Sequence, residues 1–338
     1  MEKYIKIGGL MKVSVALCTF NGEKYIKKQL DSILNQTHKV DEIIVCDDVS
    51  SDSTLTILNT YKEKHPTLFK IFVNETNLKS NKNFEKALSL TTGDYIFFSD
   101  QDDLWSSEKV SLTIDVFLNN KKTEGVFSNA NLIDDNDTEL IDNITLWDTV
   151  GFFESELKKP INFLKFILIN GNIVTGATFC VSKKVKEFCF PFHTNEKNLY
   201  HDHWIALLLA ERNSLTCINK NLTSYRIHSN QQVGVGNILK RYECQKNNSY
   251  DYKLILGFYN PKKFNEFKLI TRFIHDKYVY HKNNYDEFFD NLVNKKVEND
   301  LFELYNEAKN NMIKKNPFKY FSKKIVYLFK NDNSLTFK

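Results

Sequence analysis

The sequence lacks the features that would assign it at once to several common classes of protein. It has no run of about eighteen apolar residues, the length that a membrane-spanning helix needs, and we expect no signal peptide because the N-terminus has no apolar core. None of its six cysteines stands in a Cys-x-x-Cys pair, so we expect a reducing compartment, no disulfide framework and no zinc site. A net charge of only +4 argues against a uniformly basic nucleic-acid-binding protein.

Two common phosphate-binding signatures are missing as well. No G-x-x-x-x-G-K-[ST] loop is present, and the Gly-Val-Gly-Asn run at residues 234–237 does not complete a dinucleotide fingerprint. His201 and His203 are also not a zinc pair, because residues two apart do not share a helix face and no further Cys or His lies at ligand spacing.

Short apolar runs alternate with amphipathic segments through about residue 130. Strands are predicted at residues 13–18, 43–46, 69–73, 95–99 and 126–130. Helices are predicted at residues 26–34, 55–61 and 81–90, and from about residue 201. Three serines can cap the second helix: Ser50, Ser51 and Ser53. The alternation predicts an α/β fold with a mainly parallel sheet, in which ligands bind beyond the carboxyl ends of the strands.

The rest of the chain is less regular. Residues 131–151 are polar and acidic and are predicted to form a loop. Small residues at 175–178, inside a β-favouring run, indicate the close approach of a ligand or a neighbouring backbone. From about residue 235 the pattern becomes helical and rich in Lys, Asn, Tyr and Phe. We therefore predict one domain over residues 1–235 and a helical, basic and aromatic region over residues 236–338.

The most informative segment is the end of the strand at residues 95–99, where apolar residues run directly into Asp100, Asp102 and Asp103. Carboxylates this close raise one another's pKa and repel, a cost that bound Mg²⁺ or Mn²⁺ would remove. The alternative is a solvated acidic turn. Asp47 and Asp48 end an earlier predicted strand, so both acidic groups are expected at the same edge of the sheet, which favours a binding site over solvation.

The order of these pieces along residues 12–235 resembles that of the family 2 glycosyltransferases. The blocks that carry the resemblance are VSVALCTFNG (13–22), SILNQT (32–37), EIIVCDDVSSD (42–52), TGDY (92–95), YIFFSDQDDLW (95–105), TGAT (175–178), HDHW (201–204) and YRIHSN (225–230). The SDQDDLW and YRIHSN runs are most similar to rhamnosyltransferase-like enzymes of bacterial surface-polysaccharide synthesis. The resemblance implies the GT-A nucleotide-sugar-binding fold, with a mixed, mainly parallel central sheet, for residues 1–235.

In this family the acidic strand end is a metal-binding DxD motif, which here reads Asp100-Gln101-Asp102. The resemblance implies Mn²⁺ or Mg²⁺, which would neutralise the charge on the departing nucleoside diphosphate. We expect Asp102 to be the direct ligand, Asp100 to bind the ribose or the metal, and Asp103 to support them. Because Asp103 adds a third carboxylate, the position of the motif stays open by one residue.

A second set of residues is implied to hold the nucleotide. Asp47 and Asp48 match the acidic pair after the family's second strand, and we expect Asp48 to accept a hydrogen bond from a pyrimidine base. The alternative for Asp48 is that it caps the next helix. Residues after the first strand would hold the base and ribose by backbone contacts and ring packing: Thr19, Phe20 and Asn21. For Phe20 the alternative is a place in the core.

Three residues later in the chain complete the implied site. Asp202 matches the family's general base, which takes the proton of the acceptor hydroxyl, and the alternative is an N-capping aspartate. His201 departs from the glutamate that is common before this base. His228, in a predicted loop with Arg226, is expected to approach the metal or the diphosphate, and Arg226 to pair with phosphate oxygens. A lone surface histidine is the alternative for His228.

Together these residues predict a metal-dependent inverting glycosyltransferase. It would move a hexosyl or deoxyhexosyl group from a UDP- or dTDP-linked sugar to a glycan or lipid-linked glycan of a bacterial surface polysaccharide. One alternative is a sugar nucleotidyltransferase, which would need a Gly-rich loop with Arg and Lys after the first strand. The other is a non-catalytic carbohydrate-binding protein on the same fold, which would lack the base or the metal motif.

The predicted location is the cytoplasm. The stretch 309–330 is rich in lysine and aromatic residues and contains no acid. It is predicted to form either an ordinary amphipathic helix or a peripheral contact with the inner face of the cell membrane.

Overall fold

The structure is a computed structural model. It describes residues 5–6, 9–140, 144–152, 161–194, 199–229 and 231, and short runs between residues 299 and 317. The chain divides into two compact units, one formed by Met1–Ser155 and Asn172–Ile238 and the other by Glu156–Gly171 and Leu239–Lys338. The domain boundary predicted near residue 235 falls outside the described residues and stays a prediction.

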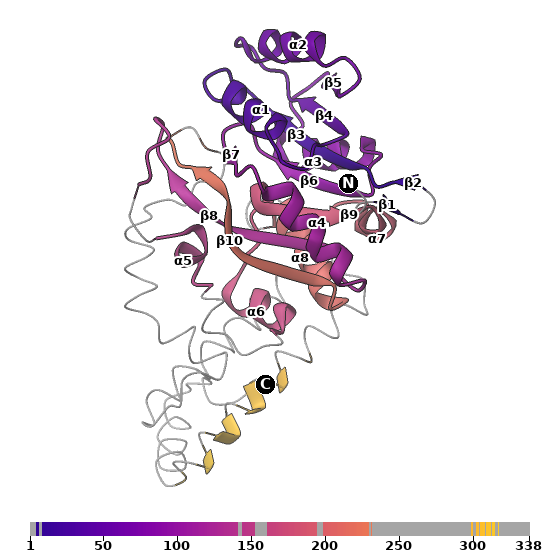
Figure 1. Cartoon of the computed structure of the whole chain (residues 1–338). Helices are drawn as coiled ribbons and strands as arrows, with labels where there is room; N and C mark the ends of the chain where they lie inside the picture. The colour runs from indigo at the N-terminus through magenta and orange to yellow at the C-terminus, as the bar shows by residue number, and fades with distance from the viewer. Residues whose placement is uncertain are drawn as a thin grey trace. The chain divides into compact units, whose positions relative to one another are not determined.

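The first unit is built on an eight-stranded sheet with the strand order β5-β4-β3-β6-β9-β8-β10-β7 (Figure 1). Its strands are β3 (Val13–Thr19), β4 (Glu42–Asp47), β5 (Phe69–Val73), β6 (Tyr95–Ser99), β7 (Leu104–Trp105), β8 (Gly125–Ile133), β9 (Phe179–Ser182) and β10 (Leu215–Arg226). β3 to β6 are parallel, as are β8 and β10, whereas β9 is antiparallel to β6 and β8, and β7 is antiparallel to β10. The predicted mixed, mainly parallel sheet is confirmed. A two-stranded ribbon of β1 (Ile5–Lys6) and β2 (Gly9–Leu10) precedes it.

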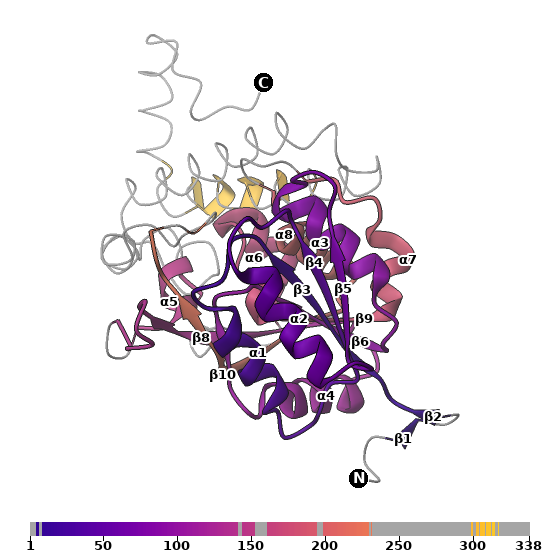
Figure 2. The ribbon, with the colours of Figure 1, turned by 90° about the horizontal axis from the view of Figure 1, so that it is seen from above.

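Helices cover both faces of the parallel part of this sheet (Figure 2). The α-helices among the described residues of this unit are α1 (Ile26–Leu34), α2 (Thr54–Lys64), α3 (Lys79–Leu90), α4 (Lys109–Asn119), α5 (Leu146–Val150), α7 (Lys186–Cys189) and α8 (His201–Glu211). On one face α1, α2 and α4 share a core with odd-numbered strand residues such as Val15, Val45 and Phe97. On the other face α3 packs on even-numbered residues, with the Phe84 and Phe98 rings 5.9 Å apart. Strands buried on both faces give the continuous apolar runs seen in the sequence.

The strands predicted from the sequence are confirmed by β3, β4, β5, β6 and β8. The loop predicted over residues 131–151 is wrong at both ends, since β8 continues to Ile133 and α5 begins at Leu146. Trp147 of α5 is buried, with its ring 5.6 Å from that of Phe127. The Asp148 carboxylate accepts a bond from Thr145 N at 2.8 Å and so completes the start of the helix. The helix thus depends on two apolar residues, Leu146 and Trp147, and on a capping box within an otherwise polar segment.

The serine caps predicted for α2 are also wrong. Ser53 occupies the N-cap position but its side chain makes no capping bond, whereas Asp52 Oδ1 accepts from Thr54 N at 3.0 Å. Ser50 turns back toward the end of β4 and donates both its N–H and its hydroxyl to the Asp47 carboxylate, at 2.9 and 2.6 Å. The carboxylate of Asp52 also suits the positive end of the helix dipole.

Val49, between the two strand-end carboxylates and α2, has a strained backbone. Its φ of 67° lies in the left-handed region, which costs an L-residue about 1–2 kcal/mol of folding free energy. Glycine avoids this cost, but the greater conformational entropy of its unfolded state offsets about 0.5–1 kcal/mol of the gain. The side chain is 41% exposed, so little packing is lost on its removal. We expect Val49→Gly to raise the free energy of unfolding in urea by about 0.5–1 kcal/mol. Val49→Ala keeps the Cβ and is the control; an equal gain in both variants would contradict the role of strain.

Of the second unit the structure describes α6 (Phe163–Asn170) and short helical runs between residues 299 and 317. Within the described part of the chain, no helix has both the length and the apolar character that a bilayer crossing requires. Most of the basic, aromatic stretch at 309–330 lies outside the described residues, so its predicted membrane contact stays a prediction.

Candidate active site

Four carboxylates, three from one turn and one from a distant helix, are close enough to the buried hydroxyl of Tyr225 in β10 to raise its pKa. Asp100, Asp102 and Asp103 occupy the turn between β6 and β7, and Asp202 lies in the first turn of α8. Burial raises the pKa of Tyr225 well above its ordinary value, and each of the four carboxylates raises it further. The structure therefore brings the acidic motif and the predicted base to one place.

The acidic turn carries more negative charge than its surroundings stabilise. Burial raises the pKa of Asp100 to about 8, with Asp102 and Asp202 adding to the rise and the Lys109 ammonium opposing it. Burial also raises the pKa of Asp103 well above its ordinary value, and Asp103 Oδ2 is buried with no hydrogen-bond partner among the described residues. A divalent cation with a preference for carboxylate oxygens would relieve both conditions. No group of three or more His, Cys, Asp or Glu in the described ranges is already arranged to hold a metal ion.

His228 lies beside the acidic turn, in agreement with its predicted neighbourhood. Its Nε2 is 2.9 Å from Asp102 Oδ2, and its ring centroid is 4.9 Å from that of Tyr25. Only 9% of the His228 side chain is exposed, so the alternative of a surface histidine is wrong.

Arg226 is the last residue of β10 and not part of a loop, so its predicted loop position is wrong. The side chain is fully buried and joins the acidic turn to residues 134–138. Nε donates to Asp102 O at 2.7 Å, Nη1 donates to Asp134 O, and Nη2 pairs with the Asp137 carboxylate. The guanidinium carbon lies 4.8 Å from the centroid of the Tyr25 ring. These bonds hold the guanidinium in place, and its contact with phosphate stays a prediction.

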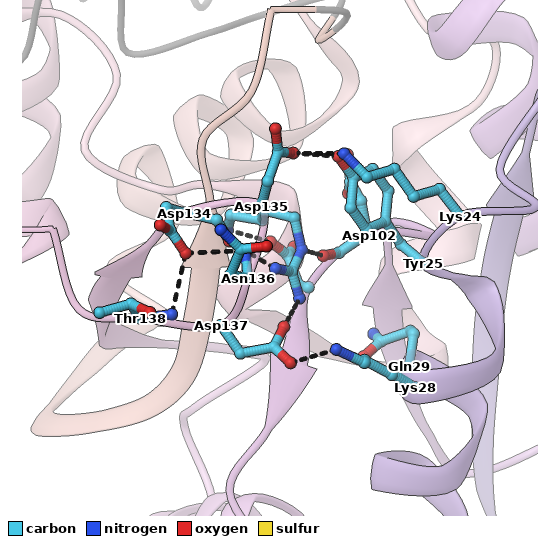
Figure 3. Close-up of polar contacts among 12 residues, drawn as sticks. Lys24, Tyr25, Lys28, Gln29, Asp102, Asp134, Asp135, Asn136, Asp137 and Thr138 are labelled. Atoms are coloured by element: carbon cyan, nitrogen blue, oxygen red, sulfur yellow. Dashed lines mark hydrogen bonds and ion pairs between the residues drawn. The ribbon is translucent and has the colours of Figure 1, made fainter.

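Residues 134–138 are also tied to α1 and the residues before it (Figure 3). Lys24 Nζ lies 3.0 Å from Asp135 Oδ1, which also accepts from the Tyr25 hydroxyl, and Lys28 pairs with Asp137. The lysine pairs are exposed, so each contributes little stability by itself. Their combined effect is to hold this loop next to the acidic turn.

The two strand-end carboxylates at the predicted nucleotide edge are buried and hydrogen-bonded. Asp47 Oδ2 accepts from the Thr19 hydroxyl at 2.7 Å, which joins the ends of β4 and β3. Asp48 Oδ1 accepts from Leu78 N at 2.7 Å and Oδ2 from Lys79 N at 2.8 Å, at the start of α3. Asp48 therefore does not cap α2, the helix that follows it, and that alternative is wrong.

Phe20 and Asn21 follow β3 at the same edge. Phe20 is 47% exposed, so its alternative place in the core is wrong. Asn21 N donates to Ser50 Oγ at 2.9 Å, and Asn21 Oδ1 accepts from Ser51 N at 2.8 Å. These bonds lay the segment after β3 alongside the segment after β4.

Gln101 is a positioning residue that the sequence reasoning missed. Its Oε1 accepts from Phe20 N at 2.8 Å and its Nε2 donates to Phe20 O at 2.9 Å, so one amide joins the acidic turn to the segment after β3. A Cβ added to Gly22 would lie 2.2 Å from Gln101 Oε1, so the glycine makes room for this amide. The only sequence signal was an amide at the middle position of the acidic motif.

Asp202 is held by three donors. Its Oδ1 accepts from Asn172 Nδ2 at 3.1 Å and from His203 N at 2.6 Å, and its Oδ2 accepts from Gly176 N at 2.8 Å. Burial raises its pKa to about 6, although these hydrogen bonds oppose the rise. The N-cap of α8 is Tyr200, so the alternative of an N-capping Asp202 is wrong. Asn172 was not anticipated, since nothing in its sequence neighbourhood points to a carboxylate thirty residues away.

His201 packs as an uncharged ring behind this carboxylate. It stacks on Phe84 with the ring centroids 4.0 Å apart, and its backbone N–H donates to Asn81 Oδ1 at 2.9 Å. Burial lowers its pKa to about 3, so the ring is neutral near pH 7. The residue before the base thus fixes α8 against α3.

The family described as Glycosyl transferase family 2 matches residues 14–182, which are half of the 338 residues. The chain belongs to glycosyltransferase family 2. It is therefore an enzyme that transfers glycosyl groups, and the suspected family is confirmed. The matched residues run from β3 to the end of β9 and include the acidic turn, whereas Asp202 lies beyond them.

Similar glycosyltransferases are found in several bacteria. A dTDP-rhamnosyl transferase of Shigella flexneri, RfbG, is 29% identical over 235 residues, 64% of this chain and 73% of that protein. The Escherichia coli protein WfgD, a UDP-Glc:alpha-D-GlcNAc-diphosphoundecaprenol beta-1,3-glucosyltransferase, is 27% identical over 207 residues, 61% of this chain and 73% of that protein. An uncharacterized glycosyltransferase of Nostoc is 29% identical over 224 residues, 64% of this chain but only 65% of that protein.

The fold of this glycosyltransferase is similar to that of Staphylococcus aureus TarS. The two structures superpose with a TM-score of 0.50 over 90% of this chain and 54% of TarS, at 18% sequence identity. At that identity the likeness concerns the fold alone, and it agrees with the α/β GT-A fold expected from the sequence.

Proposed function

We propose that this family 2 glycosyltransferase is metal-dependent and inverting. Its donor would be a UDP- or dTDP-linked hexose or deoxyhexose, and its acceptor a glycan or lipid-linked glycan of a bacterial surface polysaccharide. The observation that supports the proposal most is that Asp202 lies close enough to Asp100 to raise its pKa, as expected if the proposed base and the acidic motif serve one site. The activities for which the Shigella and Escherichia relatives are named support these donor and acceptor classes.

In the proposed reaction Asp202 is the general base. The acceptor hydroxyl oxygen forms a bond to the anomeric carbon while the bond from that carbon to the diphosphate oxygen breaks on the opposite face. The hydroxyl proton passes to the Asp202 carboxylate, and the nucleoside diphosphate leaves with the electron pair. A pKa of about 6 keeps the carboxylate mostly ionised at neutral pH while leaving it basic enough to accept a proton.

The acidic turn would hold Mn²⁺ or Mg²⁺ through Asp102, with Asp100 and Asp103 in support. The raised pKa of Asp100 and the unpartnered Oδ2 of Asp103 fit an ion with oxygen ligands. When bound, such an ion would stabilise the negative charge that develops on the diphosphate. His228, which already contacts Asp102, and Arg226 would face the metal and the phosphate oxygens.

The nucleotide would lie along the ends of β3 and β4. A carboxylate oxygen can accept two hydrogen bonds, so Asp48 Oδ2 could take a base N–H in addition to that of Lys79. The exposed ring of Phe20 offers a face on which the base can pack. Thr19, Asn21 and Asp47 would hold these two segments in register through the bonds described above.

Transfer assays with a panel of donors test the proposal. The protein would be incubated with UDP- and dTDP-linked sugars, Mn²⁺ and both free and lipid-linked glycans, and release of the nucleoside diphosphate would be measured. A sugar nucleotidyltransferase would instead release pyrophosphate from a nucleoside triphosphate and a sugar phosphate, and a binding protein would release neither. Failure to release diphosphate from every donor would reject the proposed activity. Retention of the anomeric configuration, seen by NMR of the product, would reject the inverting mechanism alone.

Gln101→Met is expected to raise the KM for the donor about tenfold with kcat within about twofold of wild type. The variant loses two hydrogen bonds to Phe20, each worth about 0.5–1.5 kcal/mol, and so loosens the segment on which the nucleotide would lie. Gln36→Met is the matched control, because the Gln36 amide also binds main chain (Ser106 O, 2.7 Å) but not at this edge. An unchanged donor KM in Gln101→Met would contradict the nucleotide's placement.

The location in the cytoplasm and the contact of residues 309–330 with the inner membrane face also remain proposals. Binding of the full chain to anionic vesicles, compared with neutral vesicles, would test the second.

A further inference from the structure

Lys109, the first residue of α4, is a buried lysine that the mechanism above does not use. It is 1% exposed, which is rare for a lysine. Its Nζ donates to Ala177 O at 2.5 Å and to the Thr223 hydroxyl at 2.9 Å, and it lies 4.2 Å from the centroid of the Trp105 ring. The three N–H groups of the ammonium can therefore be directed to two oxygens and one aromatic face.

Each of these three partners leads to a part of the active site. Ala177 belongs to the short 3₁₀ turn Gly176–Thr178, whose first residue donates its backbone N–H to Asp202 Oδ2 at 2.8 Å. The carbonyl of Ala177, which accepts from Lys109, is thus one residue along the chain from the N–H of Gly176, which donates to Asp202. Trp105 lies two residues after Asp103 in the acidic turn, and Thr223 lies two residues before Tyr225. One ammonium therefore connects β7, which directly follows the acidic turn, with β10 and the turn that holds Asp202.

Two other side-chain hydrogen bonds reach the turn that Lys109 holds: the Thr223 hydroxyl donates to Ala177 O at 3.4 Å, and Thr178 Oγ1 donates to Thr175 O at 2.8 Å. The residues of the turn are Gly176, Ala177 and Thr178, which have short side chains or none. A Cβ on Gly176 would lie 2.8 Å from His201 Nε2, so the turn lies directly against the start of α8. A small displacement of its backbone would therefore move the donor to Asp202.

Fold stability alone does not explain a lysine at this position. Burial lowers the pKa of Lys109 to about 7, while the charges of Asp103 and Asp100 oppose the fall. A buried charge replaced by a well-packed apolar side chain of similar volume is often neutral or stabilising. The ammonium is instead suited to binding a carbonyl while the charges of Asp103 and Asp100 favour its protonated form.

We propose that Lys109 is a positioning residue that fixes the Gly176–Thr178 turn, and through it the base Asp202, relative to the acidic turn. This inference rests on the proposed role of Asp202 as the base. Lys109 does not touch substrate; it sets the distance between the group that takes the proton and the groups that would hold the diphosphate.

The test is a double-mutant cycle of Lys109→Met and Asp202→Asn, measured with radiolabelled donor so that low rates are seen. Lys109→Met is expected to lower kcat about 10²-fold, since a displacement of about 1 Å in a catalytic group has an effect of this size. The donor KM should stay within about threefold of wild type, since the nucleotide edge is untouched. In the Asp202→Asn background, Lys109→Met should change the remaining rate less than about twofold, because the carboxylate that Lys109 positions is already absent.

Two results would overturn the proposal: a kcat of Lys109→Met close to wild type, or effects of the two substitutions that simply multiply. An Asp202→Asn variant as active as wild type would instead reject the proposed base, and this is a separate outcome. Lys186→Met is the matched control. Lys186 of α7 is also partly buried and donates to a backbone carbonyl (Thr91 O, 2.6 Å), but outside the site, so its kcat and KM should remain unchanged.

Thr223→Val keeps the test decisive if Lys109→Met does not fold. It removes the hydroxyl that accepts from Lys109 at 2.9 Å and also donates to Ala177 O at 3.4 Å, with almost no change in volume. We expect a fall in kcat of about three- to tenfold, as for the loss of one hydrogen bond of about 1 kcal/mol, at an unchanged donor KM. A kcat equal to that of wild type would overturn the proposal.

Discussion

Asp202→Asn should lower kcat for sugar transfer by about 10²–10⁴-fold, the usual contribution of a general base. The asparagine keeps the size of the side chain and can still accept from Asn172 and His203 with its oxygen. Its amide nitrogen would face Gly176 N–H, and the lost bond would lower the free energy of unfolding by about 1 kcal/mol. Steady-state kinetics and thermal melts measure the two effects. A fall in activity that only matched the loss of folded protein would contradict a catalytic role.

The pH dependence gives a second measurement of the same group. Because burial raises the pKa of Asp202 to about 6, the carboxylate is ionised above that pH and protonated below it. A base must be ionised, so kcat/KM of the wild type should be level above about pH 6 and fall about tenfold per pH unit below it. The remaining activity of Asp202→Asn should lack this fall. If kcat/KM fell in the same way below pH 6 in both proteins, the titration of another group would be responsible.

Asp102→Ala should abolish the part of nucleoside diphosphate binding that depends on Mn²⁺. An ion bound by the acidic turn contributes several kcal/mol at a phosphoryl oxygen, so we expect affinity for UDP or dTDP in Mn²⁺ to fall on the order of 10²-fold. Affinity in EDTA should be nearly the same for the variant and the wild type. Titration calorimetry with and without Mn²⁺ measures both.

Asp94→Asn is the matched control for this variant. Asp94 directly precedes β6, the same strand that Asp100 follows at the other end, and forms an ion pair with Lys183 at 2.9 Å. Its replacement should leave the Mn²⁺ dependence unchanged. If wild-type affinity for the nucleotide is the same in Mn²⁺ and in EDTA, the metal role of the acidic turn is wrong.

The parallel half of the sheet was predictable because its signal is local. A strand buried on both faces is apolar along its whole length, as in β3 and β4, and such runs alternate with amphipathic helices at short spacing. Segments stabilised by distant partners were not predictable. α5 owes its place to Trp147 packing on Phe127, and Arg226 belongs to a strand because β10 pairs with β8, far away in the chain.

The residues of the candidate site also fall into two groups, those that a local sequence pattern indicates and those that it does not. The acidic residues after β6 and the pair after β4 stand out because carboxylates seldom follow buried strands in clusters. Gln101, Asn172 and Lys109 do not stand out, since an amide or a lysine in a polar neighbourhood has no unusual pattern. Their significance depends on hydrogen bonds to residues that the sequence does not place beside them.

The sequence by itself determined the family, the positions along the chain of the strands that form the parallel half, and the residue types available at their ends. These follow from apolar periodicity and from short motifs, which are properties of neighbouring residues. Only the tertiary structure decided that Asp202 lies close enough to Asp100 to raise its pKa, that His228 contacts Asp102, and that one buried ammonium connects the two sides of the site. The reason is physical: chain folding, and not spacing along the chain, sets the distances on which electrostatic interaction and hydrogen bonding depend.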